Sequence, residues 1–548
     1  MATNAWYGGD QYYWTVVSAI VCLALIFGYL AMPSPQNRAV LRLPRPSGYL
    51  PVLGNTLLVA RVQLSGRFHD WVFDNCREHQ GRPWCMHVLG KAPTVFVCTP
   101  GDFEDVQKTQ YEAFGKNPLF VEAATDVLGQ GVFAISGPLW FHQRKVASRL
   151  FSTQMVQHNM DVVVSAKCKE LMRCLDLASE QENSTNGVVG LKWMLDLFTM
   201  DVFCKVGFGI EMQGMEREPI IAMLEALQRS SARIVGRILE PSWCWKLRRC
   251  LNIGAEKQFA SDMKRVNDML YKFIARSMEE KASSDVDRQD DSDPRMDLIS
   301  LHLEQEAADN GKDNEVVLTK LRDFIVSFLA AGQDTTATAM SWFVVMMNRY
   351  PKVLERVREE VRAKLPDLAN GKQRVPSLHE THHLVYLDAT IRETLRLYPV
   401  APISGRTATR DVTLSNGLFL VKGTSVHMPH YAMGRMRSVW GSDADEFKPE
   451  RWIDPHSERV SAVSPFKFTA FYGGPHACLG MKFAMSEIKI TLAALLSRYD
   501  FKTLRDPFDY TYRMALSLRI DDGLNVAVSH VTERKQQELS QAFQRSAS

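Results

Sequence analysis

The stretch FYGGPHACLG, residues 471–480, places one cysteine after a pair of glycines and before a helical pattern. Gly473 and Gly474 permit backbone conformations that other residues avoid, so this loop can pack against a flat ligand. Cys478 directly precedes a helix expected from about Leu479, whose N-terminal N–H groups and dipole favour a thiolate. The stretch therefore predicts a reactive or metal-binding thiolate, although a cysteine among glycines is by itself more simply a buried thiol in a turn.

Length and composition are those of a folded protein. The chain has 548 residues, of which 46% are hydrophobic and 23% charged, which argues against wholesale disorder and allows one large domain or several ordinary ones. The net charge of +3 gives no indication of nucleic-acid binding. The ten cysteines include no Cys-x-x-Cys pair, so they predict neither a disulfide framework nor a zinc array. We expect most of these thiols to be small core residues.

The N-terminus carries an uninterrupted apolar segment. Residues 12–32 contain no charged side chain, and as a helix they would span about 31 Å, the thickness of a bilayer core. Arg38, Arg42 and Arg45 follow this segment, whereas residues 1–11 hold no basic residue. The positive-inside rule therefore predicts a luminal N-terminus, a transmembrane helix and a cytosolic body. A cleaved signal peptide is the alternative.

The rest of the chain divides by composition. A proline-rich hinge is expected over residues 33–60, a catalytic domain over 61–532 and a polar tail over 533–548. The domain is mainly helical in pattern, with short strands such as Thr94–Cys98. The polar segments 178–187 and 282–296 are expected to be surface loops. A hairpin is expected from two further strands joined by the turn Ser415-Asn416-Gly417, namely Val412–Leu414 and Leu418–Val421.

A second chemical motif lies inside an apolar helix expected over residues 318–349. A helix that is apolar on all sides should be buried, yet its centre contains Asp334 and Thr335. The structural interpretation is a local kink in which the Thr335 hydroxyl bonds to the Ala331 carbonyl. The functional interpretation keeps this kink and makes Asp334 and Thr335 a relay that carries protons to bound oxygen.

Residues 471–480 resemble the haem-binding loop of the cytochrome P-450 monooxygenases. This resemblance implies that Cys478 is the axial ligand of the haem iron, that Phe471 covers its sulfur and that Gly480 leaves room for the macrocycle. A thiolate ligand pushes electron density toward bound oxygen and favours O–O cleavage. One residue departs from the family pattern: His476 stands where the family usually has an arginine that contacts a haem propionate.

Other family positions recur in the same order along the chain. The resemblance assigns haem-propionate contacts to three residues: Trp140, Arg144 and Arg406. It assigns a buried structural network to three more: Glu393, Arg396 and Arg451. For the Glu393–Arg396 pair, which shares a helix face at i, i+3, the alternative is an ordinary surface ion pair. The implied fold is the mainly α cytochrome P-450 fold, with a large helical domain and a small β-rich region.

The wider sequence resembles the fatty-acid ω-hydroxylase clan of eukaryotic members. The matching stretches are 128–152, 200–211, 331–342, 431–452 and 464–480. The resemblance implies hydroxylation of long-chain fatty acids at or near the ω carbon. Five small or apolar residues near the two motifs are candidate walls of a narrow substrate channel, with core packing as the alternative: Ala330, Ala331, Ala401, Pro402 and Ile403.

The resemblance also implies the cofactors, partners and location. The cofactor is haem b, O2 is a co-substrate, and NADPH supplies electrons through a separate membrane-bound reductase, because no glycine-rich nucleotide loop follows a strand. The partners expected are this reductase, membrane lipid and a small lipophilic substrate, and no nucleic acid. The expected location is the endoplasmic reticulum membrane.

Three other functions stay open at this point. The same machinery can hydroxylate a sterol, a terpenoid or another lipid. A haem-based gas-binding protein would need no acid–alcohol pair. A haem-thiolate isomerase or dehydratase would take no external electrons.

Overall fold

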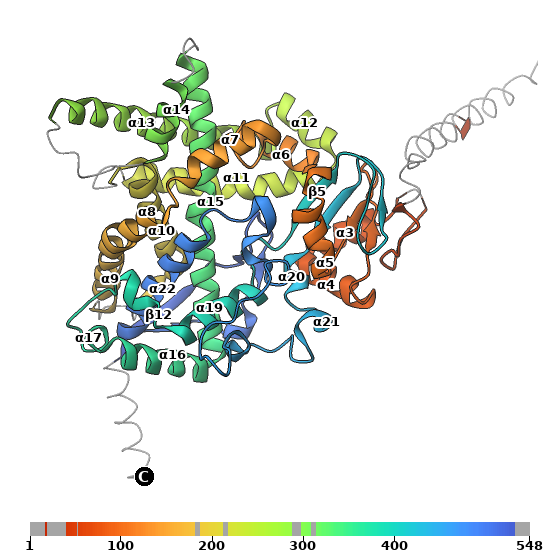
Figure 1. The fold of residues 1–548 in the computed structure, drawn as a ribbon. Helices are drawn as coiled ribbons and strands as arrows, with labels where there is room; N and C mark the ends of the chain where they lie inside the picture. The colour runs from red at the N-terminus through yellow and green to blue at the C-terminus, as the bar shows by residue number, and fades with distance from the viewer. Residues whose placement is uncertain are drawn as a thin grey trace, which may run out of the picture.

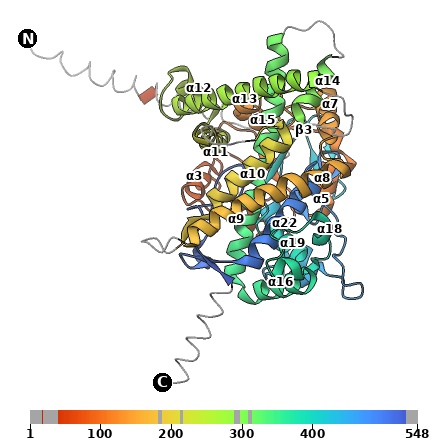
Figure 2. The ribbon, with the colours of Figure 1, turned by 90° about the vertical axis from the view of Figure 1, so that its left-hand side faces the viewer.

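Helix α15 (Asn314–Arg349) runs through the middle of the molecule in both ribbon views (Figure 1 and Figure 2). The computed structural model describes residues 17–18, 40–51, 53–180, 187–211, 217–287, 297–307 and 314–531. On either side of its centre, α15 is buried without interruption over 321–329 and 336–347. The apolar pattern thus predicted this helix and its burial correctly, and the helix begins four residues earlier than expected.

The helices that pack on α15 position the two motifs. Helix α10 (Leu191–Phe208) packs along α15, and a side chain at Gly332 would lie 2.6 Å from the Phe203 ring, so the close approach of the two helices requires glycine. Helices α19 (Val385–Leu397) and α22 (Met481–Arg498) also contact α15. Helix α22 was expected to begin at about Leu479 and begins two residues later, because Gly480 is its N-cap.

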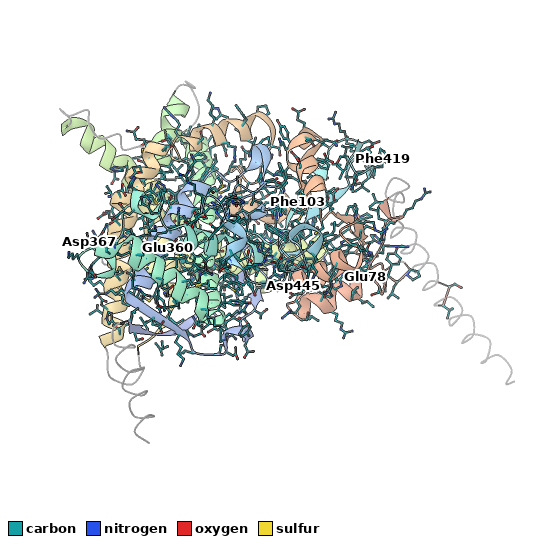
Figure 3. All side chains as sticks on the ribbon, turned by 60° about the horizontal axis from the view of Figure 1, so that its bottom comes forward. Glu78, Phe103, Glu360, Asp367, Phe419 and Asp445 are labelled. Carbon is teal, nitrogen blue, oxygen red and sulfur yellow. The ribbon has the colours of Figure 1, made fainter. Side chains whose placement is uncertain are left out.

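The strands gather beside this helical body. A five-stranded sheet has the order β1-β2-β8-β5-β3, with β2 (Thr94–Phe96) and β8 (Ser425–Met428) parallel and the other pairs antiparallel. In Figure 1 its strand β5 lies on the right with α3, α4 and α5. Figure 3 shows Phe103, which is fully buried, in the interior and the half-exposed Phe419 at the periphery. The β-rich region therefore has a core of its own, separate from the cluster around α15.

The remaining elements have the following bounds. The other α-helices are α3 Thr56–Leu64, α4 Phe68–Glu78, α5 Pro100–Glu104, α6 Pro118–Leu128, α7 Gly137–Ser148, α8 Thr153–Asn159, α9 Ser165–Glu180, α11 Arg217–Leu239, α12 Ser242–Cys250, α13 Gly254–Asp287, α14 Leu298–Ala307, α16 Pro351–Lys364, α17 Pro366–Ala369, α18 Leu378–Thr381, α20 His430–Met433 and α21 Arg437–Trp440. The other strands are β1 Trp84–Met86, β3 Phe114–Lys116, β4 Val188–Gly190, β5 Ser404–Ala408, β6 Val412–Thr413, β7 Phe419–Leu420, β9 Tyr499–Thr503, β10 Tyr512–Arg513, β11 Arg519–Ile520 and β12 Asn525–His530. Short π- or 3-10 helices are η1 Asp105–Thr109, η2 Tyr111–Ala113, η3 Met160–Val164, η5 Pro449–Trp452, η6 Thr469–Phe471, η7 Gly474–His476 and η8 Pro507–Asp509.

The predicted boundaries hold to different degrees. The expected hairpin is confirmed by the antiparallel pair β6–β7. Helix α13 continues to Asp287, so the first part of the expected loop 282–296 is helical. Helix α3 begins inside the expected hinge 33–60, where Val40 and Val59 are buried against the body. The hinge is therefore shorter than its proline content suggested, because its apolar residues pack.

The expected transmembrane helix over residues 12–32 and the polar tail over 533–548 lie outside the described residues, apart from residues 17–18. Among the described residues, no helix combines the length and apolar character needed to cross a bilayer.

Candidate active site

The cysteine loop is held in place by its own backbone and by helix η1. The Cys478 N–H donates to the Phe471 carbonyl at 2.8 Å, which closes the loop on itself. The Gly473 N–H donates to the Gln107 side chain at 2.8 Å. Gly474 has φ +63°, and a side chain there would lie 2.0 Å from the Gln107 carbonyl oxygen, so this close approach requires glycine. These contacts therefore hold Cys478 in a fixed position.

The Cys478 thiol is accessible to solvent and is also largely surrounded by protein. Its side chain is open to solvent, yet it lies deep enough that burial raises the pKa of the thiol. The Gly480 N–H and the Arg144 charge oppose this shift. The helix start thus acts in the direction predicted from the sequence, but desolvation outweighs it when no cation is bound. A bound cation would reverse the balance, since a coordinated thiol loses its proton.

A cluster of cations lies beside the cysteine loop. Lys116 on β3 is the register partner of Arg406 on β5, and both charges, with Arg144, act on the His476 ring. Among the described residues, no carboxylate pairs with Lys116, Arg144 or Arg406. Burial and the neighbouring cations lower the pKa of Lys116 to about 7. Like charges opposite each other on paired strands are destabilising, so this arrangement predicts an anionic ligand.

The predicted propionate residues converge on this cluster. The rings of Trp140 and His476 lie 4.0 Å apart, and Arg144 donates to the Ala477 carbonyl. Arg406 donates to the Tyr472 hydroxyl at 3.1 Å. Burial first, and then the surrounding cations, lower the pKa of His476 to about 2, so this side chain is neutral at physiological pH. A neutral histidine can serve an anion as a hydrogen-bond donor.

The centre of α15 is accessible, unlike the buried stretches 321–329 and 336–347 on either side of it. Ala330 is exposed and Ala331 and Thr335 are partly accessible, although the residues on both sides are buried. The Thr335 hydroxyl donates to the Ala331 carbonyl at 2.6 Å, as predicted from the sequence. Of the other candidate walls, Ala401 is exposed, Ile403 is partly accessible and Pro402 is buried. Pro402 is therefore packed in the core and is not a channel wall.

Asp334 is held in an ion pair. Its Oδ1 accepts from Arg519 Nε at 2.8 Å and Nη2 at 2.6 Å, and Lys192 lies 3.5 Å away. Its Oδ2 accepts from the Ser517 hydroxyl. Burial raises the pKa of Asp334, but the charges of Arg519 and Lys192 and these hydrogen bonds hold it well below its usual value. The acid predicted to relay protons is thus ionised and occupied.

The predicted structural network is confirmed in detail. Glu393 and Arg396 are fully buried and paired at 2.7 and 2.8 Å, and Arg451 donates to Glu393 at 2.9 Å. Trp452 adds a further bond to Glu393 at 2.9 Å. Arg396 also donates to carbonyls of the later segment at residues 434, 444 and 446. The network therefore fixes the chain that leads to the cysteine loop, as expected for a structural role.

The residues present fit a haem. An accessible thiol suits the iron, and three cations that have no carboxylate partner among the described residues suit the two propionates. A Cβ atom added at Gly480 would make only ordinary contacts with the protein, and it would lie 4.0 Å from the Cys478 sulfur. Fold and site together therefore define a haem-thiolate protein.

Comparison with known proteins agrees. A model of the cytochrome P-450 family matches residues 44–522. Cytochrome P-450 704C1 of Pinus taeda is 32% identical over 88% of this chain and 93% of its own length. Cytochrome P-450 86B1 of Arabidopsis thaliana is 29% identical over 97% and 92%, and cytochrome P-450 CYP94D109 of Paris polyphylla is 30% identical over 79% and 85%. The chain belongs to the cytochrome P-450 family of monooxygenases, whose members use haem iron, O2 and electrons from a reductase.

Several residues of the site escaped the sequence reasoning. Gln107, Lys116, Tyr472, Ser517 and Arg519 join it only through strand pairing and loop packing. Of these residues, only Tyr472 lies inside the loop that the sequence singled out, so sequence reasoning could have included it. In the structure Tyr472 has φ +59°, a conformation that non-glycine residues rarely adopt and that is common at functional sites.

Proposed function

We propose that this protein hydroxylates long-chain fatty acids at or near the ω carbon. The observation that carries this proposal is the accessible apolar strip of small residues at the centre of α15, Ala330 and Ala331, next to Thr335. Small side chains leave space for a narrow hydrocarbon chain. The resemblance of five sequence stretches to the ω-hydroxylase clan supports the same substrate class.

When bound, haem b would supply the site of O2 binding and oxygen insertion into a C–H bond. This chain's residues provide the rest. Cys478 would hold the iron, while Lys116, Arg144, Arg406, Trp140 and His476 would hold the propionates. Thr335 and Asp334 would move protons on the oxygen side. NADPH would supply the electrons through a separate reductase.

The proposed location follows from the substrate. A fatty acid partitions into bilayers, and an enzyme anchored through residues 12–32 in the endoplasmic reticulum membrane can take it from there. The catalytic domain would face the cytosol, where a membrane-bound reductase meets it.

A lipid panel tests the substrate class. Purified full-length protein, a cytochrome P-450 reductase and NADPH are incubated with fatty acids of 12 to 18 carbons, a sterol and a terpenoid. Mass spectrometry should find fatty acids carrying one added oxygen near the methyl end. Turnover of the cyclic lipids alone would replace the substrate class, and NADPH use independent of any lipid would contradict the monooxygenase.

The thiolate is tested separately. Under carbon monoxide, the reduced protein should show the red-shifted Soret band of a thiolate-bound haem, and Cys478→Ser should abolish it. An unchanged band in this variant would refute the ligand assignment.

A further inference from the structure

The cysteine loop rests on a buried turn that lies 366 residues earlier in the chain. In η1 the Gln110 N–H donates to the Asp105 carbonyl at 2.9 Å, which is the i to i+5 bond of a π-helix. Gln107, in the middle of η1, is 1% exposed. Its Oε1 accepts from the Gly473 N–H at 2.8 Å, and its Nε2 donates to the Met428 sulfur at 3.4 Å. Both polar ends of Gln107 are therefore used where the cysteine loop begins.

Two buried carboxylates fix the chain around the start of η1. Asp102 and Asp105 are 1% and 6% exposed, and within the described part of the chain neither forms an ion pair. Asp102 Oδ2 accepts from the Thr99 hydroxyl at 2.7 Å, and Asp105 Oδ1 accepts from the Thr109 hydroxyl at 2.7 Å. Burial raises the pKa of Asp102 to about 6. Because buried carboxylates without a cation are costly, the other hydrogen bonds to these two groups carry weight.

Those other hydrogen bonds come from the turn of the β6–β7 hairpin. The Ser415 N–H donates to Asp105 Oδ2 at 2.7 Å, and the Asn416 side-chain amide donates to Asp102 Oδ1 at 2.6 Å. Burial raises the pKa of Asp105, but its hydrogen bonds, first among them those from Ser415, hold it below its usual value. The ionised Asp105 therefore depends on a turn that lies 310 residues later in the chain.

These contacts form a continuous path to the cysteine. We call Asp102, Asp105 and Gln107 the brace. The hairpin turn holds the two carboxylates, the carboxylates hold η1, and Gln107 holds Gly473. Helix η1 also packs directly on η7, which ends two residues before Cys478. A movement of η1 would therefore move the loop that carries the sulfur.

We propose that the brace residues Asp102, Asp105 and Gln107 are positioning residues that keep the Cys478 sulfur on the haem iron, with the β6–β7 turn as their outer support. This inference rests on the proposed role of Cys478 as the iron ligand, and it does not depend on the substrate class. Without the brace the loop can shift, and the sulfur then leaves the iron although the fold remains.

The brace is tested without substrate, reductase or NADPH. Full-length haem-loaded protein is reduced chemically under carbon monoxide, and the red-shifted Soret band is followed over time. Gln107→Leu leaves the buried Gly473 N–H without an acceptor, so the band should be lost about tenfold faster than in wild type. Gln107→Glu keeps an oxygen at this position and should lose the band at the wild-type rate.

The hairpin turn offers a matched pair of variants. Ser415 is the second residue of a turn in which the Gly417 N–H donates to the Leu414 carbonyl at 2.9 Å, and proline is favoured at this position. Ser415→Pro keeps the turn but removes the N–H that donates to Asp105, whereas Ser415→Ala keeps that N–H. The band should be lost about threefold faster, or more, in Ser415→Pro than in Ser415→Ala.

Circular dichroism separates positioning from support of the fold. The helical signal should stay constant while the band is lost, and a helical signal that falls in step with the band would overturn the proposal. Equal rates for Gln107→Leu and wild type would also overturn it, as would equal rates for the two Ser415 variants, which decide the matter if Gln107→Leu fails to fold. A wild-type protein without the red-shifted band would instead refute Cys478 as the ligand, and the brace with it.

Discussion

The Thr335 hydroxyl lies at the accessible centre of α15, between two buried stretches of the helix, where it can take part in proton transfer. We expect Thr335→Ala to retain haem, because among the described residues the Thr335 hydroxyl bonds only to the Ala331 carbonyl of the same helix. NADPH should still be consumed, but a larger share of its electrons should end in hydrogen peroxide. Product formation should fall by about 100-fold, the lower end of the usual loss for a missing proton-transfer group. Peroxide and product are measured in one reaction. Full coupling would remove Thr335 from proton delivery.

His476 offers a second test at the residue scale. Replacing it with arginine would restore the usual family residue but add a fourth cation beside Lys116, Arg144 and Arg406. The haem-free variant should lose about 1–3 kcal/mol of stability, while the haem-loaded variant should be as stable as wild type or more so. Urea unfolding of both forms measures this difference, and rapid haem loss from the variant would show that His476 has another role.

A residue of the site could be predicted from the sequence where the residues next to it in the chain indicate its role. Cys478 stands among glycines, and Glu393 and Arg396 share a helix face, so both were predicted. Lys116 and Arg519 were not, because each reaches the site through a strand register or a hairpin that local sequence does not encode. Pro402 was misplaced because the pattern does not show which way a loop residue points.

At the scale of elements, the Glu393 network decides whether the cysteine loop is held. Glu393→Gln would leave Arg396 buried without its carboxylate partner and Arg451 paired with Asp443 alone, and breaking a buried pair in this way costs about 3–5 kcal/mol. The matched control changes Asp445, which is labelled in Figure 3. Asp445→Asn breaks the exposed pair with Arg437 and should cost less than about 1 kcal/mol. Urea unfolding of the purified variants measures both.

The outcome that contradicts this prediction is equal stability of the two variants. It would mean that the network is solvated in solution. Loss of haem from Glu393→Gln alone would confirm that the network acts through the loop, since Glu393 has no contact with Cys478.

At the scale of the whole molecule, buried histidines predict acid sensitivity. Burial lowers the pKa of His69 and His427 to about 4 and that of His430 to about 3. Between these values and about 6.5, the unfolded chain binds protons that the folded chain does not, so stability falls as pH falls. Each histidine should remove about 1 kcal/mol between pH 7.5 and 5.5.

The test compares urea midpoints at the two pH values. His427→Gln should reduce the pH dependence by about 1 kcal/mol, and His379→Gln, a change at an exposed position, should leave it unchanged. A midpoint independent of pH in the wild-type protein would show that these histidines are protonated in the fold.

Much of the fold could be predicted from the sequence, because long helices have a clear apolar periodicity. Helix α15 and the β6–β7 hairpin followed from periodicity and turn residues alone. The order of the five-stranded sheet did not, since β2 pairs with β8 from more than 300 residues later. Short strands carry too few residues to specify such distant partners.

The facing cations on β3 and β5 have a consequence for the life of the protein in the cell. Lys116 and Arg406 on these paired strands repel each other until a dianionic ligand binds beside them. A newly made chain should therefore pair β3 with β5 stably only when it binds its cofactor. At a cofactor level of about a thousand times the dissociation constant, the gain would be about 4 kcal/mol. Iron or porphyrin starvation would then lower the amount of enzyme, because cofactor-free chains would be degraded by proteases. The activity of enzyme molecules that already hold haem would not yet have fallen.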